Sequence, residues 1–283
     1  MSESHRATAA SWLASGEPAI VVEVVAALGS APREAGTRML VGLERLVGTV
    51  GGGHLEFKAI DVARAMLRNG AQSPRSVHYP LGPALGQCCG GAVTLAFTPL
   101  DDRTMEAWPK EVPRFHLQLY GAGHVGRAIV KALSPLNVLV DWIDERDSEF
   151  PQDLELPSHV NKVCVDAVEA EVDAAPRGCF YLVLTHQHDL DMRIGEAILR
   201  RNDFGFFGLI GSKTKRNRFI HRFEERGLPP AAIAGMTCPI GVSGIKGKEP
   251  EVIAVAVVAQ LLQADSARRA IPSLPQAHDR ELM

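Results

Sequence analysis

The chain has 283 residues, of which 46% are apolar and 22% are charged, which is typical of a soluble globular protein long enough for two domains. Its formal net charge of -3 at pH 7 offers no basic surface to a polyanion, so nucleic acid is not an expected partner. The N-terminal stretch MSESHRATAASWLASG lacks the cationic segment and apolar core of a secretion signal, and no apolar run is long enough to span a bilayer. We therefore expect a cytoplasmic protein with no membrane partner.

Residues 1–100 are predicted to form a small α/β domain. The expected elements are a short amphipathic helix over 4–15, strands over 19–25, 39–41, 46–50 and 92–97, and a helix that ends near Leu67. Three glycines, Gly51, Gly52 and Gly53, lead into that second helix. Backbone N–H groups at a glycine-rich helix start favour an anion. A crowded crossover from strand to helix is the alternative interpretation.

A glycine-flanked pair of cysteines, Cys88 and Cys89, follows Gln87 in the stretch LGPALGQCCGG. The chain holds five cysteines, an odd number that does not indicate a disulfide framework, and no second pair stands at the spacing of a zinc site. Thiolates are soft ligands, suited to a soft or high-valent metal centre. The pair is therefore a candidate ligand or nucleophile, with inert packing as the alternative.

An acidic, proline-bearing segment without periodicity, 101–113, is predicted to link the two domains. The second domain is expected over 114–265. The last residues, 266–283, are predicted to form a flexible tail.

The second domain opens on FHLQLYGAGHVGRAIVKALSPLNVLVDWID, residues 115–144, a pattern of strand, glycine turn, helix and strand. Gly121 suits the tight turn, Gly123 the approach of a phosphate and Gly126 the close packing of helix on strand. Asp144 stands 18 residues after Gly126, where a ribose hydroxyl is read in dinucleotide-binding folds. The fold class is therefore α/β, with a C-terminal Rossmann-like, doubly wound parallel sheet beside the smaller N-terminal α/β domain.

Further strands are predicted over 163–166, 179–185 and 204–210. The second of these ends on His186, His188 and Asp191, which partly resemble the metal motif of metallo-β-lactamase-type hydrolases but lack its Asp-His pair and the downstream histidines. Ligands of open α/β sheets bind at the carboxyl ends of strands, so this loop could orient a ligand. It could also simply cap the helix expected over 191–200.

The strand over 204–210 leads into a helix start with hydroxyl and cationic side chains. Ser212, Lys213, Lys215 and Arg216 could cradle a phosphate there, although this is not a Walker A loop and the charges could simply face water. A glycine-rich loop over 238–250 then precedes an apolar helix expected over 251–262.

Six sequence blocks together carry a family resemblance. In chain order they are GTVGGGHLE, LGPALGQCCGG, YGAGHVGRA, LTHQHDLD, GLIGSKTKR and CPIGVSGIKGKEPEVIA. In this order and spacing the chain resembles the XdhC/CoxI family of xanthine dehydrogenase accessory proteins over about 18–262.

This resemblance implies a factor, not itself an enzyme, that binds the molybdenum cofactor, protects it during sulfuration and delivers it to apo xanthine dehydrogenase or another molybdenum hydroxylase. It also implies a homodimer and a cysteine desulfurase as a further partner. By resemblance, Cys88 or Cys89 would contact molybdenum or sulfur, with Gln87 beside them. The glycines of 51–53, the turn of 121–126 with His124, and the loop of 212–216 would hold the pterin and its phosphate, and NAD or NADP could bind at the turn.

The same residues are compatible with two other functions. An NAD(P)-dependent oxidoreductase is supported by the glycine turn and Asp144, but His124 is placed for phosphate binding and not for proton transfer beside a nicotinamide. A metal hydrolase would use His186, His188 and Asp191. It lacks further ligands in the sequence.

Overall fold

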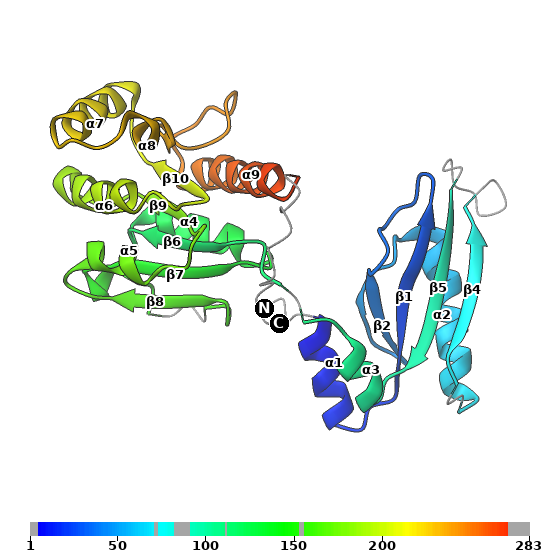
Figure 1. Cartoon of the computed structure of the whole chain (residues 1–283). Coiled ribbons are helices and arrows are strands. Elements are labelled where there is room, and N and C mark those ends of the chain that lie inside the picture. Colours follow the sequence, from blue (N-terminus) through cyan, green and yellow to red (C-terminus); the bar gives the residue numbers. More distant parts are fainter. Residues whose placement is uncertain (1–4, 71–72, 82–90, 111, 153–155, 271–283) are drawn as a thin grey trace, which may run out of the picture. The chain divides into compact units, whose positions relative to one another are not determined.

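The computed structural model describes residues 5–70, 73–81, 91–110, 112–152 and 156–270. The chain forms two compact units that part at Lys110 (Figure 1). In the described part of the chain, none of the helices combines the length and the apolar character needed to cross a membrane.

The N-terminal unit is built on a five-stranded antiparallel sheet with the strand order β3-β2-β1-β5-β4. Its strands are β1 (Ala19–Leu28), β2 (Arg38–Gly42), β3 (Leu46–Gly48), β4 (Arg75–Pro80) and β5 (Ala92–Pro99). The edge strand β4 was not predicted, because only Tyr79 in it is buried and its apolar alternation is weak.

Helix α2 (Gly53–Arg68) covers one face of this sheet (Figure 1). Alternate residues of β1, such as Ile20 and Val22, are buried against this helix. Helices α1 (His5–Ala14) and α3 (Asp102–Ala107) pack together on the opposite face at one end. A central strand with two covered faces explains the near-continuous apolar run at the start of β1.

Helix α3 lies within 101–113, the segment predicted to be an irregular linker, so that description is wrong for residues 102–107. Asp101 caps the helix by accepting a 2.7 Å hydrogen bond from the Thr104 N–H. Met105 and Trp108 are buried with Trp12 of α1. The segment is therefore ordered by its cap and by contacts distant in sequence, which the local composition does not reveal.

The C-terminal unit contains a six-stranded parallel sheet with the order β11-β10-β9-β6-β7-β8. The strands are β6 (His116–Tyr120), β7 (Leu139–Asp144), β8 (Val160–Cys164), β9 (Phe180–Val183), β10 (Phe206–Leu209) and β11 (Met236–Thr237). This is the doubly wound Rossmann-like order, with the switch between β6 and β9, and it confirms the predicted fold class. Strand β8 starts three residues earlier than predicted, and the two-residue β11 was not foreseen.

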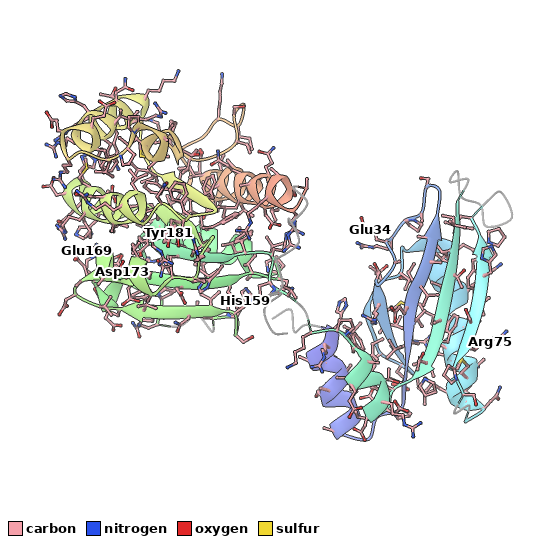
Figure 2. All side chains as sticks on the ribbon, in the orientation of Figure 1. Glu34, Arg75, His159, Glu169, Asp173 and Tyr181 are labelled. Atoms are coloured by element: carbon pink, nitrogen blue, oxygen red, sulfur yellow. The ribbon has the colours of Figure 1, made fainter. Side chains whose placement is uncertain are left out.

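Helices cover both faces of the parallel sheet. One face carries α4 (His124–Leu133) and α9 (Pro250–Arg269), which pack on each other. The other carries α5 (Glu171–Ala174), α6 (His188–Arg201), α7 (Lys213–Glu225) and α8 (Pro230–Ala234), with the 3-10 turn η3 (Val168–Ala170), while η2 (Asp147–Glu149) follows β7. Tyr181, labelled in Figure 2, lies in the core of this second face.

The final helix corrects the predicted start of the flexible tail. Helix α9 continues to Arg269, four residues past the expected limit at Asp265. Asp265 is fully buried and pairs with Arg114 at 2.7 Å and with Arg269 at 2.9 Å. These ion pairs hold the last turn against the start of the C-terminal unit, and such long-range pairs are not visible in the tail's own composition.

Candidate functional site

The glycine turn after β6 combines two packing glycines and one open glycine. Gly121 has φ +121°, and a Cβ added there would stand 2.4 Å from the carbonyl oxygen of Leu184. A Cβ on Gly126 would stand 2.1 Å from the carbonyl oxygen of Gly121, while a Cβ on Gly123 would meet no atom within 4 Å. Gly121 and Gly126 therefore let α4 approach the sheet, and Gly123 borders free space.

That free space lies at the N-terminus of α4. Gly123 is the N-cap and His124 is exposed. The first N–H groups of a helix have no acceptor within the helix, and among the described residues none accepts from the N–H of Gly123 or His124. Together with the helix dipole, donors without an acceptor favour the approach of an anion.

Asp144 occupies the predicted position at the end of β7, but it binds the protein itself. Its Oδ2 accepts from the Ala122 N–H at 2.7 Å and from Arg146 Nη2 at 3.0 Å, and its Oδ1 accepts from the N–H and Nε of Arg146, each at 3.0 Å. Burial acts to raise the pKa of Asp144, but these hydrogen bonds and the Arg146 charge outweigh it and hold the pKa below its usual value. Four donors use the lone pairs that a ribose would need.

A small cavity sits beside Asp144 at the carboxyl ends of β6, β7 and β9, where the strand order reverses. Its walls include Gly121, Thr185 and Leu190, and its volume of about 10 Å³ holds at most about one water. His186 and Glu145 both line this cavity, and His186 Nε2 lies 3.7 Å from Glu145 Oε1. The crevice is therefore nearly closed in this conformation.

Asp191 anchors the loop that follows β9. Its side chain is 1% exposed, and Oδ1 accepts from the Thr185 N–H at 3.0 Å and the Thr185 hydroxyl at 2.7 Å. Its Oδ2 pairs with Lys215 Nζ at 2.6 Å, and Lys215 also donates to the Ile210 carbonyl at 2.8 Å. The ion pair thus ties the end of β9 to the start of α7.

The remaining candidate residues lie at the starts of helices α6 and α7. His188 begins α6, and no group of three or more histidine, cysteine or acidic side chains within the described ranges could hold a metal ion, so the geometry gives the hydrolase hypothesis no support. Ser212 caps α7 by accepting from the Lys215 N–H at 3.2 Å, Lys213 is exposed and Arg216 is half-buried. Lys213 and Arg216 could still meet an anion, whereas Lys215 is already paired.

The glycine loop of 51–53 already surrounds a carboxylate of the protein. All three glycines have positive φ. Glu56 Oε2 accepts from the Val50 N–H at 3.2 Å, from the Gly52 N–H at 3.1 Å and from the hydroxyl of Thr49. Sequence reasoning missed this role, although an acidic residue in the first turn of a helix is a capping signal.

Gln87, Cys88 and Cys89 lie outside the described residues, but the base of their loop is defined. The loop joins β4 to β5, and the Leu81 N–H donates to the Gly91 carbonyl at 2.8 Å. A Cβ on Gly91 would stand 2.7 Å from the Ser30 carbonyl oxygen, and one on Gly51 would stand 2.5 Å from Pro32 Cγ. The base of the cysteine loop and the glycine loop therefore flank the same connection between β1 and β2.

Comparison with known proteins assigns both units of the chain. Residues 117–261 match the XdhC Rossmann domain, and residues 12–80 match the XdhC and CoxI family. The uncharacterised protein YqeB of Escherichia coli (strain K12) is 30% identical over 276 residues, which cover 92% of this chain and 47% of YqeB, so the chain spans about half the length of that relative.

A solved structure from Bacillus halodurans, described as a xanthine dehydrogenase, superposes with a TM-score of 0.77 at 20% identity, over 96% of this chain and 98% of the other. At that identity the match supports the fold alone. The two family matches together cover most of the chain. This protein belongs to the XdhC and CoxI family.

Proposed function

We propose that this protein binds the molybdenum cofactor, protects it while its terminal sulfur is installed, and inserts it into apo xanthine dehydrogenase or a related molybdenum hydroxylase. The observation that carries the proposal is membership of the XdhC and CoxI family in both units. In this role the protein is a cofactor chaperone without turnover of its own. A homodimer and a cysteine desulfurase that delivers sulfur are the partners we propose with it.

The start of α4 fits the phosphate of the cofactor. It offers the N–H groups of Gly123 and His124. A Cβ added to Gly123 would have no atom within 4 Å, so the space beside these donors is open. A phosphate can approach these donors without displacing any protein group that the structure describes. Within the same unit, Lys213 and Arg216 at the start of α7 are further cations we assign to cofactor binding.

The cysteine loop supplies the chemistry for the other end of the cofactor. Cys88 and Cys89 would provide thiolate sulfur, a soft donor suited to a high-valent metal centre, and the bound cofactor would supply the hydroxylation chemistry of the mature hydroxylase. Gln87 would hydrogen-bond beside them. The exposed Arg33 belongs to the connection between β1 and β2, which also contacts the base of the cysteine loop, and it lies close to Gly51. Its positive charge favours an anionic ligand beside this connection.

A nucleotide-dependent oxidoreductase remains the second candidate because the α4 start would also fit a dinucleotide phosphate. Its weakness is Asp144, whose carboxylate already takes four hydrogen bonds from Ala122 and Arg146. A ribose would have to displace Arg146 before Asp144 could accept from its hydroxyls. We therefore rank cofactor insertion first.

Native mass spectrometry of the anaerobically purified chain tests the proposal. The wild type, the Cys88→Ala/Cys89→Ala double variant and the Cys164→Ala control are each mixed with molybdenum cofactor and, separately, with NAD. Cys164 is an exposed thiol in the other unit, so its loss should not matter. We expect a cofactor adduct with the wild type and Cys164→Ala and little with the double variant.

Transfer is then measured by adding each loaded protein to apo xanthine dehydrogenase and following recovered hydroxylase activity. Free cofactor at the same concentration is the control for spontaneous insertion. A tight NAD complex without any cofactor adduct would contradict the proposal and favour the oxidoreductase.

A further inference from the structure

A second cavity lies wholly within the N-terminal unit, on the sheet face opposite α2. It is formed by β1, β2, β5 and α3 and has a volume of about 250 Å³. Neither the glycine loop of 51–53 nor the base of the cysteine loop contributes to its lining. The proposed cofactor chemistry therefore leaves this cavity without a role.

Arg38 presents a fixed guanidinium group to the cavity. Its Nε donates to Glu23 Oε2 at 3.0 Å and its Nη2 lies 2.8 Å from Glu23 Oε1, which is a two-point ion pair. Its carbon Cζ lies 5.5 Å from the ring centre of Trp108. The ion pair with Glu23 and the contact with the Trp108 ring hold the guanidinium group in place. The third nitrogen, Nη1, has no acceptor among the described residues and is available to a ligand.

Arg103 supplies a second cation from α3. It is exposed and lines the cavity, and no hydrogen bond or ion pair engages its side chain in the parts of the chain that the structure covers. With one carboxylate against two guanidinium groups, the lining residues carry one net positive charge. The carboxylate of Asp101, outside the lining, also interacts with the charge of Arg103. Thr98 adds a hydroxyl that is not used by another described group.

The remaining wall is apolar and comes from Val21, Ala107 and the buried Trp108. A concave site with a few convergent polar groups on an apolar wall is the usual form of a small-molecule site. The charge favours an anionic ligand, because a cation would be repelled by Arg103, and a neutral acceptor would form a weaker hydrogen bond with Arg38 than an anion does.

We propose that this cavity binds a small molecule bearing an oxyanion, a carboxylate or a phosphate, with Arg38 and Arg103 as its ligands and the Trp108 wall beside its apolar part. The lining of this cavity shares no residue with the proposed cofactor site. The pre-positioned Arg38 reduces the entropy lost when the anion binds.

Tryptophan indole NMR of the ¹⁵N-labelled full-length chain tests this site. The chain has three tryptophans, of which Trp108 lines the cavity and Trp142 is buried in the other unit. Inorganic phosphate and malonate are titrated separately at constant ionic strength, and malonamide serves as the neutral comparison. We expect a saturable shift of the Trp108 signal with at least one anion, none with malonamide, and no change at Trp142.

Two variants decide whether the cavity is responsible. Arg103→Gln removes one exposed cation, and we expect it to weaken anion binding about tenfold, as loss of one charge-assisted hydrogen bond implies. Arg68→Gln removes an exposed cation from the end of α2 and should bind like the wild type. The stronger of phosphate and malonate then identifies the ligand class.

Three results would overturn the inference: no saturable shift at tens of millimolar anion, parallel shifts of all three indoles, or equal affinity in Arg103→Gln and the wild type. Because Arg103 is exposed, its replacement should leave the fold intact, and unchanged Trp12 and Trp142 signals check this. The test uses no molybdenum cofactor, so its failure is independent of the function proposed above.

Discussion

Replacing single glycines in the turn after β6 should separate packing from ligand access. In Gly126→Ala the new methyl group would stand 2.1 Å from the carbonyl oxygen of Gly121, whereas ordinary contacts begin near 3.4 Å. Helix α4 must therefore shift by more than about 1 Å or the turn must open, and overpacking of this kind costs about 3 kcal/mol. Alanine is better than glycine inside a helix by about 1 kcal/mol, so the expected net loss is about 2 kcal/mol.

Gly123→Ala is the matched control. Nothing lies within 4 Å of its added Cβ, and its φ of -69° suits any residue. We expect its free energy of unfolding to fall by no more than about 1 kcal/mol, which is the usual difference between glycine and alanine at an N-cap.

Urea unfolding followed by ¹⁹F NMR of 5-fluorotryptophan-labelled protein measures both variants. Each unit then has its own reporter, which matters because two units need not unfold together. Trp142 is the tryptophan of the C-terminal unit, and its Nε1 donates to the Gly121 carbonyl at 3.0 Å. Equal midpoints for Gly126→Ala and Gly123→Ala at the Trp142 signal would refute the packing argument, whereas Trp12 and Trp108 should be unaffected in both.

Two further changes test the buried charges of the C-terminal unit. Lys215→Met leaves the Asp191 carboxylate buried without its cation. We expect this to lower the free energy of unfolding, followed by the Trp142 signal, by about 3 kcal/mol. A loss below about 1 kcal/mol would show that water solvates the ion pair. Because the folded-state pKa of Asp144 lies below its usual 3.8, its contribution to stability is complete above that pH and is lost as the pH falls through the folded pKa. Asp144→Asn should therefore flatten the acid unfolding curve below pH 3.8, and an unchanged slope would contradict this.

The elements that the sequence predicted well are those whose pattern is local and strong. Strand β6, the glycine turn and α4 follow from a buried apolar run, three spaced glycines and a helical period within about 20 residues. β9 likewise combines full burial with a near-continuous apolar run. Parallel strands buried on both faces leave this signal because every position must be apolar.

The features that sequence reasoning missed depend on partners far along the chain. Edge strands β4 and β11 have few buried residues, so their composition resembles that of loops. Helix α3 is held by Trp12, which lies about ninety residues earlier. The chain composition near these elements therefore does not contain the information that fixes them.

The site residues divide in the same way. The glycine spacing predicts where α4 begins, but it cannot reveal that Arg146 saturates Asp144 or that Lys215 turns inward to Asp191. Both facts are set by rotamers at the carboxyl edge of the folded sheet. The capping role of Glu56 could have been predicted from the sequence, because an acidic residue in the first turn of a helix is a known capping signal.

The two glycine-rich helix starts consequently differ in how readily they can receive an anion. At 51–53 a ligand must displace the Glu56 carboxylate from three donors, and hydrogen bonds to charged groups are worth about 1.5–3 kcal/mol each, so displacement costs several kcal/mol before any gain. At α4 the N–H groups of Gly123 and His124 have no such competitor among the described residues. An incoming phosphate therefore loses less binding energy at α4. A cofactor that also engages 51–53 must bring enough contacts of its own, such as those of Cys88 and Cys89, to release Glu56.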